Sequence, residues 1–175
     1  MPNYRRIWQD GGIYFFTVAL RERGTNDLLI RHIDSLRLAT QQVRSKYPFK
    51  IHSWVVLPDH THCMIELPEG DADFALRIRL IKRQFSISLP RTERPMVRAS
   101  RGELGIWQQR YWEHLIRDES DYYSHVKYIH FNPVKHGLVT RVADWPYSTF
   151  LKWSKRGMHY GNWEQETSAM TLDHD

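Results

Sequence analysis

The sequence has few of the features that mark secreted, membrane-bound or nucleotide-dependent proteins. Cys63 is the only cysteine among 175 residues, so no disulfide can form within the chain, which is typical of a reducing compartment. No apolar run approaches the roughly 18 residues that cross a bilayer, and residues 1–6 lack the apolar stretch of a signal peptide. The Walker and GxGxxG patterns are also absent. We therefore expect a cytoplasmic protein that uses no nucleotide cofactor.

Aromatic and basic residues are what the sequence has in excess. Phe, Trp and Tyr make up 13% of the chain, and 25 Lys and Arg outnumber 20 Asp and Glu to give a net charge of +5. A positive field attracts polyanions, although a merely basic enzyme has the same balance. The length suits one domain with its own core. These features favour a nucleic-acid partner without deciding it.

The apolar pattern alternates between the strand period and the helix period. Aromatic and β-branched runs between turn signals predict strands at residues 13–20, 51–57, 62–67 and within 106–116. Apolar residues at three- and four-residue steps predict helices from Ile33 to Pro48, after Asp71 or Asp73, and from Ser120 or Asp121 to Pro133. The order is that of an α+β fold of the split βαβ type, ferredoxin- or RRM-like, with helices packed on an antiparallel sheet.

Two segments lack such a period. Residues 90–105 are rich in arginine and contain two prolines, which predicts a mobile basic loop. The segment after Gly137 carries Trp and Gly without periodicity, and we expect an irregular extension whose last dozen residues are frayed.

A His-x-His pair leads into the third predicted strand. Alternate side chains of a strand share a face, so His60 and His62 point the same way and Thr61 points the other way. Two imidazoles at this spacing can bind one divalent ion. The pair alone is weak evidence, because two of ten histidines also fall this close by chance.

A second polar group occupies the end of the last predicted helix. Tyr128 and Asn132 are four residues apart and therefore stack on one helical face, which His125 shares. Taken alone, Tyr128 fits a core aromatic and Asn132 an ordinary helix-ending residue. Joined to the histidine pair they make chemical sense. A metal held by both histidines and the Asn132 carboxamide oxygen would polarise a phosphodiester, and Tyr128 could attack phosphorus in line.

Five sequence blocks stand in a fixed order: residues 54–62 (WVVLPDHTH), 67–71 (LPEGD), 112–114 (WEH), 128–137 (YIHFNPVKHG) and 144–150 (DWPYSTF). With them the chain resembles the REP-associated tyrosine transposases, single-tyrosine members of the HUH group of nickases and transposases, over most of its length. One departure is Thr61, where the group usually has a bulky hydrophobic residue. Thr suits a strand and faces away from the metal, so we expect little effect.

The resemblance implies the same site residues that the spacing indicates: a nucleophile at Tyr128 and metal ligands at His60, His62 and Asn132. It implies cleavage and rejoining of single-stranded DNA at hairpin-forming palindromic repeats, through a covalent 5′-phosphotyrosine and with Mg²⁺ or Mn²⁺. Residues 1–137 would be the transposase domain and residues 138–175 a C-terminal extension packed on it. Related insertion-sequence transposases are dimers, whereas this extension favours a monomer.

The predicted DNA surface is basic and aromatic. Its candidate residues follow the second long helix, the basic loop and the segment after it: Arg79, Lys82, Arg83, Arg98, Arg101 and Trp107. The cations suit phosphate contacts, and Trp107, with Tyr111 and Trp112, suits the stacking of unpaired bases. A solvated helix face and a buried aromatic cluster are the alternative interpretations.

Two other functions fit parts of the sequence. A domesticated relative could bind hairpin DNA without cutting it, although all four expected site residues are present. A histidine-dependent nucleotide hydrolase would need either a third alternate histidine, where this chain has Met64, or a second His-x-Ser/Thr strand motif, which is not found. The transposase-type function is therefore the leading hypothesis.

Overall fold

The computed structural model describes residues 7–94 and 105–157. Its elements, in chain order, are β1 (Ile13–Ala19), α1 (Leu28–Arg31), α2 (Ile33–Lys46), β2 (Lys50–Val56), β3 (His60–Glu66), α3 (Phe74–Ser88), η1 (Arg91–Glu93), β4 (Trp112–Leu115), α4 (Glu119–Lys135), η2 (Val142–Asp144) and α5 (Phe150–Lys155). Within the described ranges, no helix is long and apolar enough to cross a membrane.

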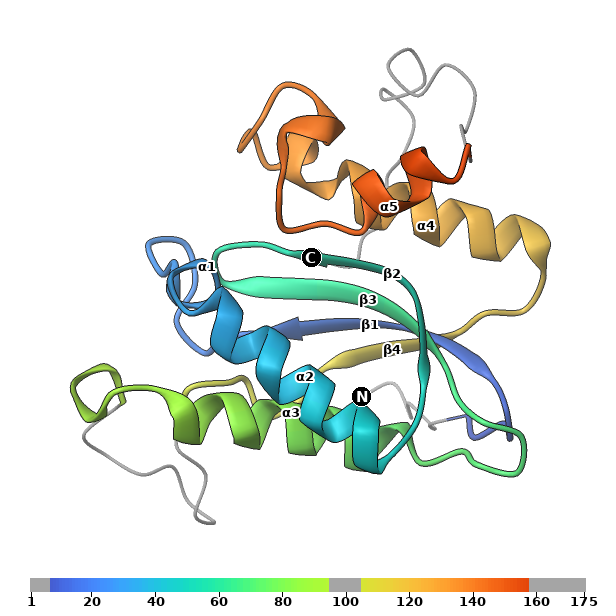
Figure 1. The fold of residues 1–175 in the computed structure, drawn as a ribbon, viewed down its shortest axis with the longest axis horizontal. Coiled ribbons are helices and arrows are strands. Elements are labelled where there is room, and N and C mark those ends of the chain that lie inside the picture. Colours follow the sequence, from blue (N-terminus) through green and yellow to red (C-terminus); the bar gives the residue numbers. More distant parts are fainter. Residues whose placement is uncertain (1–6, 95–104, 158–175) are drawn as a thin grey trace, which may run out of the picture.

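The four strands form one sheet in the order β2-β3-β1-β4, and every neighbouring pair is antiparallel. Figure 1 shows α2 and α3 on one face of this sheet and α4 with α5 on the other. This arrangement confirms the expected split βαβ plan, in which both crossover helices cover the same face. The short α1 helix was not expected from the sequence, and only four residues of the segment 106–116 form the edge strand β4.

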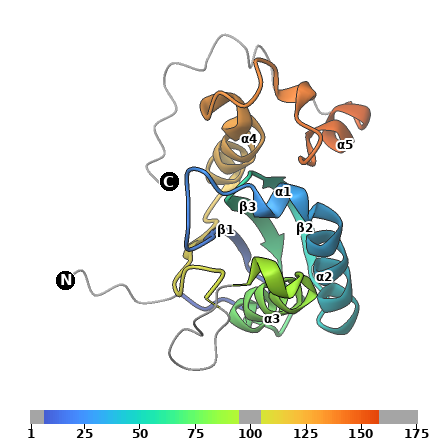
Figure 2. The ribbon, with the colours of Figure 1, turned by 90° about the vertical axis from the view of Figure 1, so that its left-hand side faces the viewer.

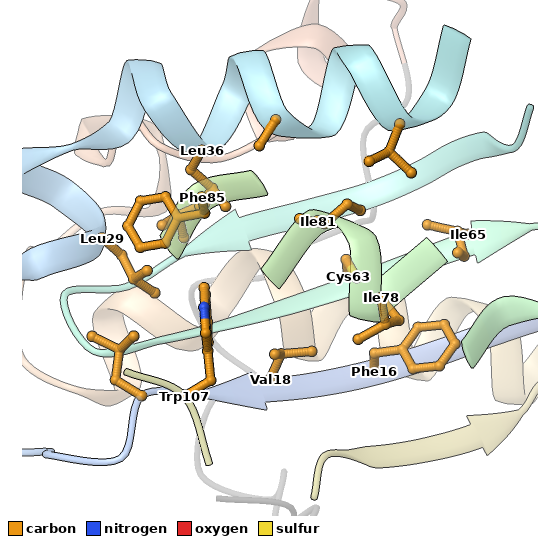
Figure 3. Close-up of a cluster of buried hydrophobic side chains, with 14 of the residues drawn as sticks. Phe16, Val18, Leu29, Leu36, Cys63, Ile65, Ile78, Ile81, Phe85 and Trp107 are labelled. Carbon is orange, nitrogen blue, oxygen red and sulfur yellow. The ribbon is translucent and has the colours of Figure 1, made fainter. Parts of the chain in front are cut away.

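The α2/α3 face of the sheet carries the main apolar core. Phe16, Val18 and Cys63 from the strands pack there against Leu36 of α2 and Ile78 of α3 (Figure 3). The expected apolar stripe of α3 is buried as its spacing requires. Asp73 begins that helix, since its side chain accepts a hydrogen bond from the Leu76 N–H at 2.9 Å.

The opposite face is covered by α4 and by the C-terminal segment. Phe15 and Met64 pack there against Val126 and Ile129 of α4 and against Trp153 of α5. Asp118 begins α4, because its carboxylate accepts from the Asp121 N–H at 2.9 Å, so the helix begins slightly earlier than expected.

The end of α4 differs from the sequence prediction. Pro133 was expected to terminate the helix, but α4 runs on to Lys135 with Pro133 inside its last turn. The stop is Gly137, whose positive φ of 68° places it in the left-handed region. Its N–H bonds to the Val134 carbonyl at 2.9 Å, and the Leu138 N–H bonds to the Pro133 carbonyl at 2.9 Å. These two bonds form the Schellman ending that glycine favours.

The segment after η2 is hydrogen-bonded to the open edge of β2 through residues 148 and 149. Ser148 forms a bridge with Val55, and the Thr149 N–H bonds to the Trp54 carbonyl at 2.8 Å. This pairing covers part of an edge strand that would otherwise present unpaired backbone groups. The last dozen residues, which were expected to be frayed, lie outside the described residues, as do residues 95–104, which make up most of the expected mobile loop.

Candidate metal and nucleophile site

His60 and His62 lie on the face of β3 that α4 covers. In the antiparallel register with β1, His62 stands opposite Thr17 and His60 opposite Ala19. Both imidazoles are buried, and their ring centroids are 4.9 Å apart. Thr61 points to the other face, where its hydroxyl donates to the Val55 carbonyl and accepts from an indole N–H. The departure at Thr61 therefore leaves the histidine pair undisturbed.

Each histidine is oriented by a bond to its Nδ1 atom. The Thr17 hydroxyl oxygen lies 2.8 Å from Nδ1 of His62, and an Asp59 carboxylate oxygen lies 2.6 Å from Nδ1 of His60. Partners of this kind fix the tautomer and ring orientation of metal-binding histidines. With Nδ1 bonded, Nε2 is the nitrogen of each ring that could bind a metal. Neither Thr17 nor the role of Asp59 was predicted from the sequence.

Burial favours the neutral form of His60. Burial and, next, the nearby His62 lower the pKa of His60 to about 4, so the ring is neutral at pH 7 and able to bind a metal. Burial would raise the pKa of Asp59, but hydrogen bonds from His60 and from the Gly24 N–H outweigh it and hold that pKa below its usual value. Asp59 is thus an anion at neutral pH.

The helix α4 and its C-cap residue bring three side chains, spaced by four residues, toward this pair. The Tyr128 ring lies edge-on to His62 with centroids 5.1 Å apart, and the His136 ring lies edge-on to His60 at 5.2 Å. Asn132 sits one turn from each of them on the same helical face. The structure thus places Tyr128 against His62, as predicted, with Asn132 buried one turn further along the same helical face.

The polar atoms at this junction suit a divalent cation. Asn132 is 0% exposed, and both its carboxamide oxygen and nitrogen are buried with no hydrogen-bond partner among the described residues. The Nε2 atom of His60 is in the same condition. Buried polar atoms without partners are costly unless a water or an ion satisfies them. One amide oxygen and two imidazole nitrogens form a donor set that fits a borderline or hard divalent metal.

A cation from the same helix approaches the tyrosine. The Nζ atom of Lys135 lies 5.1 Å from the centre of the Tyr128 ring. A positive charge near a phenol favours its ionised form. Lys135 lies in the fourth sequence block, seven residues after Tyr128, and two helical turns place it on the same side. That spacing is the signal that could have identified it.

A second polar cluster joins β4 to the start of α4. His114, Asp121 and His125 are grouped so that one potential ligand atom from each lies within 4.8 Å of the others, an arrangement that could hold a metal ion. However, the two imidazoles are stacked at 4.7 Å with an interplanar angle of 14°. Nitrogen lone pairs lie in the ring planes, so nearly parallel rings do not converge on one point. Both histidines instead bond to Asp121, at 2.8 Å and 3.0 Å.

The candidate DNA-binding residues divide between surface, core and undescribed segments. Arg79 and Arg83 are exposed on α3, as a phosphate-binding role requires. Lys82 donates to the Gln108 carbonyl at 2.8 Å. Arg98 and Arg101 fall in the stretch that the structure does not describe.

The stacking role predicted for Trp107 is not supported. Its side chain is 8% exposed and packs in the core beside Phe85, as Figure 3 shows. Its indole N–H is shared between the Lys82 carbonyl and the Ser86 hydroxyl. The buried-cluster interpretation is the correct one, because no open ring face remains for a base.

Comparisons with known proteins show the family of the chain. The family model described as "Transposase IS200 like" matches residues 19–132. A REP-associated tyrosine transposase of Escherichia coli is 47% identical over 163 residues, which cover 93% of this chain and 91% of the relative. A Haemophilus influenzae relative, given the same name provisionally, is 45% identical over 165 residues, with 93% of each chain covered.

A solved structure agrees as well. It is described as a REP-associated tyrosine transposase bound to a REP hairpin; its TM-score is 0.80 at 47% identity, covering 91% of this chain and 88% of that chain. The chain therefore belongs to the IS200-like transposase family, within its branch of REP-associated tyrosine transposases.

Proposed function

We propose that this chain nicks and rejoins single-stranded DNA in a metal-dependent reaction, with Tyr128 as the nucleophile. The observation that carries the proposal is the apposition of α4 and β3, which sets the Tyr128 ring 5.1 Å from the ring of His62. A tyrosine alone would be an ordinary core aromatic. A tyrosine one turn from a buried, unbonded carboxamide and against a histidine pair is suited to phosphoryl transfer.

The proposed metal ligands are Nε2 of His60, Nε2 of His62 and the carboxamide oxygen of Asn132. A bound divalent ion would supply positive charge for the scissile phosphodiester and its leaving oxygen. We propose Mg²⁺ or Mn²⁺, because a mixed nitrogen and oxygen set accepts either when further oxygen ligands complete the shell. Thr17 and Asp59 hold the two rings in the orientation that this requires.

The proposed nicking step exchanges one phosphoester for another. The Tyr128 hydroxyl gives up its proton, its oxygen bonds to phosphorus, and the bond from phosphorus to the 3′ oxygen breaks. The 3′ oxygen takes up a proton, and the 5′ phosphate stays on the tyrosine. Attack by a 3′ hydroxyl reverses these changes and rejoins DNA without an outside energy source. Lys135, whose Nζ atom lies 5.1 Å from the centre of the Tyr128 ring, adds positive charge beside the proposed nucleophile.

We propose hairpin-forming palindromic repeats as the substrate. The 47% identical solved relative is described as bound to a REP hairpin. We further propose residues 1–137 as the transposase domain and residues 138–175 as its extension, active as a monomer. The monomer is supported by the position of all four proposed site residues within one chain, with α4 packed on its own sheet. Light scattering tests it, and a dimer mass would overturn it.

The covalent adduct tests the proposed function. A labelled hairpin oligonucleotide incubated with protein and Mn²⁺ should give a denaturation-resistant protein–DNA adduct. The adduct should vanish with a chelator and in Tyr128→Phe. Tyr123→Phe is the matched control, because Tyr123 is exposed on the same helix. Hairpin binding with no adduct in the wild-type protein would instead support the non-catalytic binder.

A further inference from the structure

A basic groove runs along the outer edge of β2, on the far side of that strand from β3. Its walls are α2 and α5, which lie on either side of β2 (Figure 2), and its volume is about 630 Å³. The segment 146–149 forms part of its lining. Arg79, Lys82, Arg83 and Trp107, the predicted DNA-binding residues that the structure describes, do not line this groove, which we name the β2 edge groove.

The charge of the β2 edge groove is of one sign. Arg37 and Arg44 line the α2 wall, Lys152 and Arg156 line the α5 wall, and no Asp or Glu of the described part of the chain is among the lining residues. All four cations are exposed. Arg37 contacts Asp34 at 3.3 Å, but so exposed a pair contributes little and leaves the groove positive. Such a surface attracts a polyanion.

The spacing of these cations suits a phosphate backbone. Arg37 and Arg44 are seven residues apart, about 10 Å along the helix axis. In the duplex stem of a hairpin, the phosphates of one strand advance about 3.4 Å per nucleotide along the helix axis, so a stem lying along this wall would present about three of its phosphates. Lys152 and Arg156 are four residues apart and share one face of α5. The floor adds Trp54 and Tyr147, both partly exposed, and aromatic rings within a cationic groove are typical of nucleic-acid-binding surfaces.

The groove is also bonded to the helix that carries the nucleophile. The hydroxyl of Thr149, in the groove lining, lies 2.9 Å from Nε2 of His130 on α4. The same hydroxyl accepts from the Trp54 N–H at 2.9 Å. His130 is two residues from Tyr128 on the same helix. DNA held in the groove would therefore lie at a fixed position relative to Tyr128.

We propose that the β2 edge groove binds the sugar–phosphate backbone of the hairpin DNA that Tyr128 cleaves. This inference rests on the proposed function and adds the surface that holds the substrate. The test pairs one cation from each wall in Arg37→Ala/Lys152→Ala. The matched control removes two exposed cations outside the groove, in Arg117→Ala/Arg141→Ala. The charge-retaining Arg37→Lys/Lys152→Arg variant separates lost charge from disturbed folding.

Fluorescence anisotropy with a labelled hairpin oligonucleotide, over a series of salt concentrations, gives the result. The groove variant should raise Kd about tenfold and make the slope of log affinity against log salt shallower by about 1.8, since two phosphate contacts are lost. The control and charge-retaining variants should stay within about threefold of wild type. Equal loss in the control, or no loss in the groove variant, overturns the proposal. Displacement of DNA by polyglutamate of equal charge would show a general anion surface and also overturn it.

The groove and the proposed function can fail separately. Tyr128→Phe should bind the hairpin with wild-type affinity, because it leaves the groove intact. If Tyr128→Phe still forms the adduct, the proposed function fails while the binding result stands. If the adduct depends on Tyr128 but the groove variant binds as wild type, the groove fails and the proposed function stands.

Discussion

The two faces of the sheet differ in how far the buried polar atoms packed on them are hydrogen-bonded. On the α2/α3 face, the buried side chains are mostly apolar, and both terminal nitrogens of the large buried cation Arg77 are bonded, to Asp71, to the Asp73 carbonyl and to the Pro48 carbonyl. Its Nε is the one atom of that guanidinium with no partner among the described residues. On the α4 face, His60 and Asn132 are as deeply buried yet carry atoms with no hydrogen-bond partner among the described residues.

This difference indicates that the α2/α3 face mainly stabilises the fold and that the α4 face carries the proposed chemistry. Apolar burial and satisfied polar groups lower the free energy of the folded state. Buried donors and acceptors without partners raise it, and they are retained where a ligand will use them. We therefore expect substitutions on the α2/α3 face to change unfolding, and substitutions on the α4 face to change metal binding and DNA cleavage.

The largest expected effect is on the α4 face. Tyr128→Phe removes the only oxygen of that side chain, so adduct formation should fall by about a thousandfold or more, as for the loss of a nucleophile. The same variant should unfold within about 1 kcal/mol of wild type, because the ring remains in its packing site. Rapid-quench gels and urea unfolding measure the two quantities. A large loss of unfolding free energy together with the loss of the adduct would contradict the assignment of chemistry, and not stability, to the α4 face.

The corresponding substitution on the α2/α3 face is expected to change stability and not activity. Phe16 is fully buried and its ring lies 5.4 Å from that of Phe74, so Phe16→Ala should lower the unfolding free energy by about 3–5 kcal/mol. Urea unfolding measures this loss. Adduct formation per folded molecule should change little, at a temperature where the variant remains folded. A variant that is stable but has lost the adduct would contradict this assignment of the two faces.

A smaller effect is expected behind the metal site. Thr17→Val keeps the shape of the side chain but removes the hydroxyl that holds Nδ1 of His62. Loss of such a supporting bond typically weakens metal affinity about 10- to 100-fold. Titration of Mn²⁺ followed by electron paramagnetic resonance measures the affinity directly. Thr40→Val, a buried threonine on α2, is the control and should leave the metal affinity unchanged.

The smallest effect concerns the Asp71–Arg77 pair and pH. The hydrogen bond from Arg77 holds the pKa of Asp71 below its usual value of 3.8. A carboxylate with a depressed folded pKa stabilises the fold above its unfolded pKa, and this stability is lost as pH falls through the folded value. Asp71→Asn should cost about 1–2 kcal/mol at pH 7 and lose less than wild type between pH 4 and 2. Urea unfolding at a series of pH values measures the unfolding free energy of both proteins. If the free energies of wild type and Asp71→Asn fall in parallel between pH 4 and 2, the stabilising role of the Asp71–Arg77 pair is refuted.

Local patterns explain what could be predicted from the sequence. Alternation along β3 places His60 and His62 on one face, and a four-residue step places Tyr128 with Asn132, whatever the rest of the chain does. The strand and helix periods likewise predict the order of the split βαβ plan. The strands of that plan then bring the two motifs together.

What escaped prediction depends on contacts between distant segments. The irregular segment before β4 has no period, so only packing against Phe85 reveals that Trp107 belongs to the core. Thr17 meets His62 through the β1–β3 register, which sequence spacing does not encode. Pro133 was a local signal that misled, because a proline in the last turn is tolerated when Gly137 supplies the ending.

Peptide mapping of the covalent adduct tests the central claim most directly. The protein is incubated with Mn²⁺ and a hairpin oligonucleotide and is then digested with a nuclease and a protease. The peptide that carries the residual nucleotide is sequenced by mass spectrometry. We expect a nucleotide joined through its 5′ phosphate to Tyr128 and to no other tyrosine. A nucleotide on Tyr122 or Tyr123, earlier in α4, or attachment through a 3′ phosphate, would contradict it.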